Sequence, residues 1–384
     1  MIAKQQIEER FTTLFHTNPA HIVRSPGRIN IIGEHTDYNE GFVLPTAIDK
    51  AIYVAVSKRE DNLIELYAED FQASFEVALD AIQPVEQGWP NYILGVVNQL
   101  VERRLPVGGF NLYVNGDVPL GAGLSSSAAL ECATGFALNV LFDLQIERME
   151  LAKIGQLAEH TFAGVNCGIM DQFASVMSKA NHVIKLDCRD LSFDYKPLEL
   201  GEYAILLLNT NVKHSLASSA YNDRRASCEK GVAIVKEHHP QVNSLRDVSV
   251  EMLDEFVKPV DQDMYIKCRF VVQENERLNA ACNALEAGDL ETLGQEMFKA
   301  HMGLSQEYEV SCDELDFLVE YVKQFPEVLG ARMMGGGFGG CTINLVKTSF
   351  VDLLIERITP VYKNKFELDL TAINVVPSDG TSLM

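Results

Sequence analysis

A glycine- and serine-rich stretch of the chain has the composition of a phosphate-binding loop. Its residues are Gly121, Ala122, Gly123, Leu124, Ser125, Ser126 and Ser127. The alternating segment 109–115 before it predicts a strand, and apolar residues at helical spacing after it predict a helix over 127–141. A turn that enters a helix N-terminus offers free backbone N–H groups and the positive end of the helix dipole, which bind phosphate. The alternative is an ordinary connection with a serine cap.

Two further segments carry reactive side chains or unusual backbone. Residues 28–39 gather an arginine, two carboxylates and an imidazole around a short apolar run: Arg28, Glu34, His35 and Asp37. Far downstream, the segment Gly335 to Gly340 has five glycines in six positions. Such a run loses so much backbone entropy on folding that a functional reason is favoured over a plain turn.

Several single residues have an ordinary structural interpretation when they are taken alone. Asp171 begins a stretch expected to be helical as far as Lys179, where a helix cap is the first interpretation. Glu159 lies between the apolar positions of a helix expected over 148–162, which predicts a solvated face. Tyr221 falls on another expected helix and would be an ordinary core or surface tyrosine. A surface salt bridge is the default for Arg28.

Composition limits the class of partner. The chain has 384 residues and a formal net charge of −22, which argues against nucleic acid or an anionic membrane as a partner. The first ten residues lack the apolar core of a signal peptide, and no apolar run is long enough to span a bilayer. A cytoplasmic location is therefore expected. The eight cysteines form no Cys-x-x-Cys pair, so we expect free thiols, without disulfides or structural zinc.

The order of strand-like and helical segments predicts an α+β fold. Strands are expected within 29–32, 41–44, 51–56, 183–186, 204–208, 331–334, 341–346 and 370–376. Helices are expected over 91–103, 127–141, 148–162, 216–239, 265–287, 289–302 and 311–324. These segments interleave without regular parallel crossovers, which disfavours a doubly wound sheet. The polar stretch 190–202 is the expected boundary between two domains, 1–200 and 201–384.

The three motifs, in this order and spacing, resemble those of the GHMP small-molecule kinases. The variant Gly33-Glu34-His35-Thr36-Asp37-Tyr38 is similar to that of the galactokinase family in particular. The resemblance covers essentially the whole chain, and three ordered motifs are far more specific than one. It implies a two-domain GHMP kinase fold with the active site in the cleft between the domains.

The resemblance also implies roles for individual residues. Asp171, within Gly168-Ile169-Met170-Asp171-Gln172-Phe173, matches the catalytic aspartate, and Arg28 would stabilise the charge that develops on the phosphoryl group. Residues matching sugar-binding positions are Glu34, His35, Asp37, Gly168, Asp171 and Tyr221. A metal site at 34–37 is the weaker interpretation, because three ligands within four residues are cramped and no further motif completes a zinc site.

Residues 121–127 match the ATP-binding loop, and Ser127 with Glu159 matches the positions that bind Mg²⁺, a cation satisfied by a hydroxyl and one carboxylate. The resemblance implies an enzyme that transfers the γ-phosphoryl group of ATP to the anomeric hydroxyl of D-galactose. The products would be α-D-galactose 1-phosphate and ADP. We expect this enzyme to be monomeric. Two alternatives stay open: a kinase for another sugar such as N-acetylgalactosamine, and a non-catalytic galactose and ATP sensor. The full-length serine-alanine segment 125–129 and Asp171 favour the enzyme.

Overall fold

The first half of the chain is built on a mixed sheet whose strands lie in the order β13-β1-β3-β6-β4-β5. The computed structural model describes residues 2–119, 121–212 and 217–384, with no side-chain detail for 217–220. The strands of this sheet are β1 (His21–Asn30), β3 (Pro45–Lys58), β4 (Leu63–Ala68), β5 (Ala73–Ala78), β6 (Phe110–Gly116) and β13 (Ser382–Leu383). All neighbouring strands run antiparallel except β4 and β6, which are parallel.

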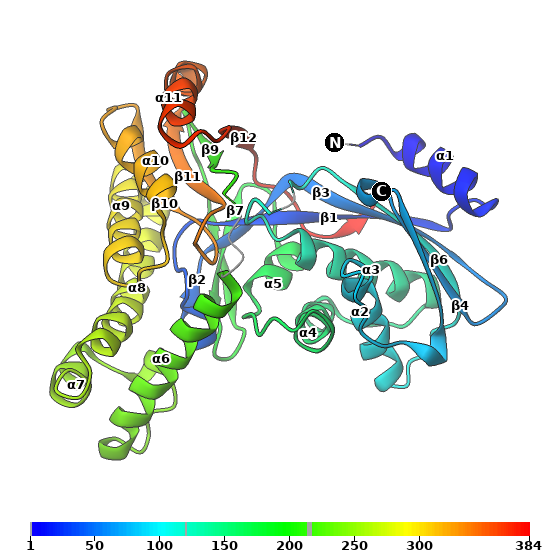
Figure 1. The fold of residues 1–384 in the computed structure, drawn as a ribbon, viewed down its shortest axis with the longest axis horizontal. Helices are drawn as coiled ribbons and strands as arrows, with labels where there is room; N and C mark the ends of the chain where they lie inside the picture. The colour runs from blue at the N-terminus through cyan, green and yellow to red at the C-terminus, as the bar shows by residue number, and fades with distance from the viewer. Residues whose placement is uncertain (1, 120, 213–216) are drawn as a thin grey trace.

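Helices cover both faces of this sheet (Figure 1). They are α1 (Lys4–Phe15), α2 (Pro90–Glu102), α3 (Ser126–Phe142), α4 (Arg148–Ala158) and α5 (Met170–Met177). Alternate residues of β3 point to opposite faces: Tyr53 packs with Phe11 of α1, whereas Val54 belongs to the core shared with α3. A smaller antiparallel sheet of β2 (Phe42–Val43), β7 (His182–Asp187) and β8 (Phe193–Pro197) adjoins α5.

The second half is built on an antiparallel sheet in the order β10-β11-β9-β12. Its strands are β9 (Tyr203–Asn209), β10 (Val328–Met333), β11 (Cys341–Lys347) and β12 (Thr371–Val375). The helices are α6 (Ala217–His238), α7 (Val250–Met252), α8 (Gln262–Ala287), α9 (Leu290–Gln306), α10 (Asp313–Lys323) and α11 (Val351–Phe366). Leu206 and Leu208 face α10 and α11, while Ile205 and Leu207 join the core of the first half.

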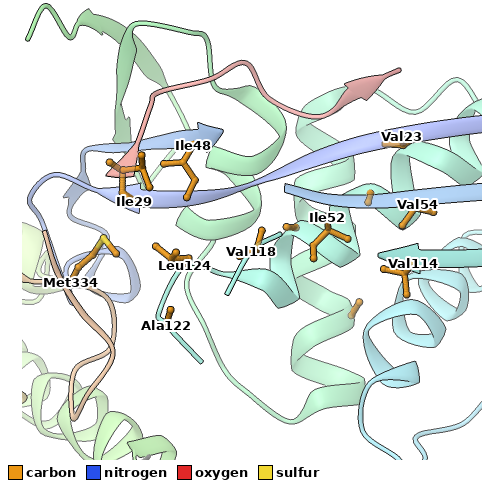
Figure 2. Close-up of a cluster of buried hydrophobic side chains, with 14 of the residues drawn as sticks. Val23, Ile29, Ile48, Ile52, Val54, Val114, Val118, Ala122, Leu124 and Met334 are labelled. Atoms are coloured by element: carbon orange, nitrogen blue, oxygen red, sulfur yellow. The ribbon is translucent and has the colours of Figure 1, made fainter. Parts of the chain in front are cut away.

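The main hydrophobic core therefore runs from one half of the chain into the other. Figure 2 shows part of it, where Leu124 and Ala122 lie beside Met334, which follows β10, and on the same side of β1 as Val118. The last residues return to the first half, where β13 pairs with β1. The division into domains 1–200 and 201–384 stays a prediction.

The mixed helix and strand content confirms the predicted α+β class. Most expected segments are present within a few residues, although the first residue of the helix expected over 216–239 lies outside the described residues. The helix expected over 148–162 is α-helical only to Ala158 and continues as a π-helical turn, Glu159–Ala163. The polar stretch 190–202, expected as the domain boundary, contains strand β8. No helix of the described residues is long and apolar enough to cross a membrane.

Candidate active site

The predicted phosphate loop connects the first sheet to α3 and is held from beneath by its apolar residues. Ala122 and Leu124 are buried in the core, whereas Gly121 and Gly123 have φ angles of 73° and 74°. Alternating buried side chains and left-handed glycines fix the loop and leave its backbone toward the open side. The first N–H groups of α3 have no partner within the helix, as at every helix start. This geometry suits a phosphate group.

Ser125 precedes α3, but its side chain does not cap the helix. Its hydroxyl instead donates a short hydrogen bond to Asp171 Oδ2. The interpretation of this loop as a plain serine-capped connection is therefore wrong, because the Ser125 side chain bonds the Asp171 carboxylate of α5 instead of capping α3.

Asp171 and Arg28 form a bidentate ion pair where β1 meets the first turn of α5. Arg28 Nε and Nη2 each lie 2.8 Å from a different oxygen of Asp171, and Arg28 Nη1 donates to the Gly123 carbonyl at 2.6 Å. The arginine side chain is 6% exposed and the aspartate side chain 27%. The cap position of α5 belongs to Ile169, so neither the helix-cap interpretation of Asp171 nor a surface salt bridge for Arg28 is correct.

A cavity of about 270 Å³ opens in front of this ion pair. It is lined by every residue predicted from the sequence to bind sugar or to act on it, together with Glu159: Arg28, Glu34, His35, Asp37, Gly168, Asp171 and Tyr221. Val165, Cys167, Met170 and the glycines 335–337 complete the wall. The cavity has the size of a small polar ligand and is rich in carboxylates, which accept hydrogen bonds from hydroxyl groups.

Glu34 is held in this wall by groups from the second half of the chain. One oxygen, Oε1, accepts hydrogen bonds from Arg332 Nη2 at 2.8 Å and from the Gly335 N–H at 2.9 Å. Arg332 is fully buried and also donates to the Asn30 and Ile31 carbonyls. Sequence reasoning missed Arg332, although a charged residue within the apolar strand β10 was a signal for it.

Asp37 is a carboxylate of the cavity whose pKa is shifted into the neutral range. Burial, and secondarily the nearby charge of Asp171, raises the pKa of Asp37 to about 7. Its Oδ2 would lie 1.7 Å from a Cβ built on Gly168. Gly168 therefore has a definite role, because any larger residue there would displace the Asp37 side chain.

The two glycine-rich loops lie against each other at the edge of the cavity. Gly335, Gly337, Gly339 and Gly340 all have positive φ, as does Phe338. A Cβ on Gly340 would lie 3.5 Å from the Ala122 carbonyl oxygen, and one on Gly336 would lie 3.5 Å from the Tyr221 ring. The plain-turn interpretation of this segment is thus wrong, since its backbone packs on the phosphate loop and on a wall of the cavity.

Ser127 and Glu159 have oxygen atoms placed as a pair of magnesium ligands would be. Ser127 Oγ lies 3.3 Å from Glu159 Oε1, and two adjacent oxygens of an octahedral Mg²⁺ site are about 3 Å apart. Glu159 is 9% exposed, contrary to the solvated face expected for it, and its Oε2 accepts a hydrogen bond from Gln172 Nε2 at 2.9 Å. The residues fit Mg²⁺, which keeps water or phosphate oxygens in its remaining positions.

A second, apolar cavity of about 300 Å³ lies beside the phosphate loop. Ser126 and Ser127 form one edge, and the rest comes from several elements of the first half: Ile52, Ala68, Asp70, Phe71, Trp89, Tyr92, Val114 and Leu130. The Phe71 and Trp89 rings are stacked at 6.5 Å between centroids. Sequence reasoning missed these residues because no local pattern connects them.

Comparison with known proteins gives consistent matches along the chain. Residues 9–58 match the galactokinase galactose-binding signature, residues 91–179 the GHMP kinases N terminal domain, and residues 282–358 the GHMP kinases C terminal domain. The galactokinase of Chloroflexus aurantiacus is 43% identical over 92% of this chain and 90% of its own length. That of Staphylococcus saprophyticus is 40% identical over 99% of this chain and 100% of its own length.

Solved structures agree with these relatives. The crystal structure of Lactococcus lactis galactokinase complexed with galactose matches with a TM-score of 0.94 and 35% identity, covering 98% of this chain and 99% of that one. Methanococcus jannaschii mevalonate kinase, at 19% identity, shares the fold with a TM-score of 0.67, covering 94% of this chain and 99% of that one.

The paired glycine-rich loops, together with the N- and C-terminal domain matches, define a small-molecule kinase of the GHMP superfamily. Within that superfamily, the galactose-binding signature and the relatives that match along nearly the full chain show which family this protein is in. The chain belongs to the galactokinase family.

Proposed function

We propose that the protein transfers the γ-phosphoryl group of ATP to the anomeric hydroxyl of D-galactose, releasing ADP and α-D-galactose 1-phosphate. The observation that carries this proposal is the position of Asp171. Its carboxylate lines the cavity that holds the sugar-binding residues and accepts a hydrogen bond from Ser125 of the phosphate loop. A hydroxyl bound beside Asp171 therefore lies next to the loop that would hold the phosphates.

Asp171 would orient the anomeric hydroxyl and accept its proton as the oxygen attacks the γ-phosphorus. Phosphoryl transfer requires mainly positioning of the acceptor and neutralisation of charge on the transferring group. Arg28 is buried and fixed by two hydrogen bonds to Asp171, so it supplies a positive charge that need not reorganise during the reaction. Its third contact, to the Gly123 carbonyl, ties this charge to the phosphate loop.

The nucleotide would lie across the phosphate loop with its base in the apolar cavity. The backbone of residues 121–127 would hold the phosphates, and the cavity beside Ser126 and Ser127 has the aromatic lining that suits a purine ring. Ser127 and Glu159 would hold Mg²⁺, which would neutralise negative charge on the phosphate oxygens. The acidic net charge of −22 makes this organised site necessary, because the overall field repels ATP.

We further propose that the protein is cytoplasmic and monomeric and binds neither nucleic acid nor membrane. The acidic charge balance supports the absence of polyanionic partners. The eight free cysteines suit a reducing compartment.

Purified protein should release ADP from ATP far faster with galactose than with glucose. Glu34, Asp37 and Tyr221 line a cavity built for one pattern of hydroxyl groups. Inverting one hydroxyl leaves a buried polar group unpaired, at about 1–3 kcal/mol for each group. A coupled ADP assay across a panel of hexoses and N-acetylgalactosamine measures this preference. Equal rates with galactose and glucose would refute the assignment of the cavity.

The apparent KM for galactose should fall as pH rises from 6 to 8. Asp37, whose pKa is raised to about 7 by burial and the Asp171 charge, is mostly protonated at pH 6 and mostly ionised at pH 8, and the ionised form accepts more hydrogen bonds from the sugar. An Asp37→Asn variant should have a higher KM that no longer varies over this range. KM measured at fixed saturating ATP tests the expectation, and a wild-type KM that is flat with pH would contradict it.

A further inference from the structure

A chain of buried hydrogen bonds runs from the sugar cavity into the second half of the molecule. His35 Nδ1 lies 2.8 Å from the Tyr38 hydroxyl, which lies 2.8 Å from the Tyr308 hydroxyl. The Tyr308 hydroxyl in turn lies 3.3 Å from Cys228 Sγ. His35 and Tyr38 belong to the sugar motif, whereas Tyr308 follows α9 and Cys228 lies on α6.

The imidazole at the head of this chain is enclosed by aromatic rings. The rings of Tyr38, Tyr221 and Tyr308 have centroids 5.9, 5.2 and 5.0 Å from that of His35. Burial lowers the pKa of His35 to about 4, despite the nearby Glu34 carboxylate that raises it. The ring is therefore neutral near pH 7 and carries a single N–H, on either Nδ1 or Nε2.

The second ring nitrogen, Nε2, is buried and has no side-chain partner among the described residues. A backbone contact with Gly336, short of ordinary hydrogen-bond geometry, slightly offsets the lowering of the His35 pKa by burial. His35 lines the sugar cavity together with the carboxylates of Glu34, Asp37 and Asp171. The Gly336 contact leaves the hydrogen-bonding capacity of Nε2 unsatisfied by ordinary geometry, and a hydroxyl group bound in this cavity can supply the missing partner.

The chain favours one of the two tautomers. Burial raises the pKa of both Tyr38 and Tyr308, so each keeps its hydroxyl hydrogen. The imidazole nitrogen is the most basic acceptor in the chain, and a phenol is a better donor than acceptor toward it. The Tyr38 O–H therefore donates to Nδ1 and accepts from Tyr308, which leaves the hydrogen on Nε2. The carboxylate-rich cavity favours the same arrangement, since its negative potential stabilises an N–H more than a lone pair.

We propose that Tyr38 and Tyr308 are positioning residues that fix His35 as the Nε2–H tautomer, so that its imidazole donates a hydrogen bond to a hydroxyl oxygen of the sugar. When they are ionised, the carboxylates of the cavity accept hydrogen bonds but cannot donate them. A fixed imidazole donor thus requires a sugar oxygen that accepts at one position while its neighbours donate. This selects the orientation of hydroxyl groups around the ring. The inference rests on the proposed function, because it takes the cavity to be the sugar site.

The first experiment reads the tautomer without any sugar. Long-range ¹⁵N–¹H correlation spectra of ¹⁵N-histidine-labelled protein distinguish the two neutral tautomers, and the His35 signals are assigned by their loss in a His35→Gln variant. We expect the Nε2–H form in the wild type and a mixture in Tyr38→Phe. An Nδ1–H or doubly protonated ring in the wild type would overturn the proposal. This result does not depend on which sugar the protein phosphorylates.

The second experiment measures the consequence for galactose. Tyr38→Phe should raise KM about tenfold and Tyr308→Phe about threefold, as expected for the loss of a buried hydrogen bond and of its support, with kcat changed by less than about threefold in both. The matched control is Tyr195→Phe, which removes a hydroxyl that bonds the Met177 carbonyl away from the sugar cavity and should leave KM unchanged. ATP affinity should be close to wild type in all three variants. The melting temperature should fall by only a few degrees, about 2–4 °C, as expected for the loss of one buried hydrogen bond, so each variant should stay folded under the assay conditions.

A double-mutant cycle separates positioning from general damage. In a His35→Ala background, Tyr38→Phe should have no further effect on KM. If Tyr38→Phe raised KM equally in both backgrounds, the tyrosine would act on packing and the proposal would fail. If His35→Ala left KM unchanged while galactose was still phosphorylated, the imidazole donor would be excluded although the proposed activity stood.

Discussion

Replacing Asp171 with asparagine should lower kcat for galactose phosphorylation by a factor of about 100 or more, the usual range for a lost general base. Asparagine keeps the size of the side chain but cannot accept the proton of the anomeric hydroxyl. In the wild type the Arg28 guanidinium contacts both carboxylate oxygens of Asp171 at 2.8 Å. In the variant an amide offers it only one oxygen, and the N–H₂ group replaces the other. ATP affinity should be largely kept. Steady-state kinetics with galactose, together with calorimetric titration of a non-hydrolysable ATP analogue, measure both quantities.

Two controls make the Asp171 result interpretable. Asp352→Asn changes an exposed aspartate at the start of α11 and should leave kcat and stability unchanged. Ser125→Ala removes one hydrogen bond to Asp171 without changing its charge and should have a much smaller effect than Asp171→Asn. A near-normal kcat for Asp171→Asn would reduce this residue to a structural partner of Arg28.

The second large effect is expected at the proposed magnesium ligands. Ser127→Ala and Glu159→Gln should each lower kcat and raise the magnesium concentration needed for half-maximal rate, because an alanine offers no oxygen and a carboxamide is a poor ligand for a hard cation. The two oxygens lie 3.3 Å apart. If both bind one ion, as we propose, their effects should be sub-additive in the double variant. Rates titrated with Mg²⁺ at fixed ATP measure this.

The fold of these variants should survive, which separates loss of the metal from loss of structure. Alanine is a good helix former at the start of α3, and the carboxamide oxygen introduced by Glu159→Gln can still accept a hydrogen bond from Gln172. Fully additive effects with an unchanged magnesium requirement would place the cation elsewhere. The phosphate-loop assignment would stand in that case, since it rests on the backbone of residues 121–127.

The sequence by itself determined those loops and helices that depend on the preferences of neighbouring residues. Gly121 and Gly123 permit positive φ angles that other residues resist, and the apolar period that follows them predicts α3, so the loop and its helix were both readable. The resemblance to galactokinases likewise depended on short ordered motifs, and the family comparisons confirm it. Preferences of this kind act over a few neighbouring residues, which is the range that a sequence pattern records.

Only the tertiary structure decided what those residues face. Local rules made Asp171 a helix cap, whereas the fold pairs it with Arg28, 143 positions away. Glu159 was expected in solvent and is buried against Ser127 and Gln172. The apolar cavity beside the phosphate loop, and the hydrogen-bond chain that starts at His35, are assembled from elements that no shared pattern connects. Such contacts depend on sheet register and helix packing, which are set by burial of the whole core, so no single segment carries their signal.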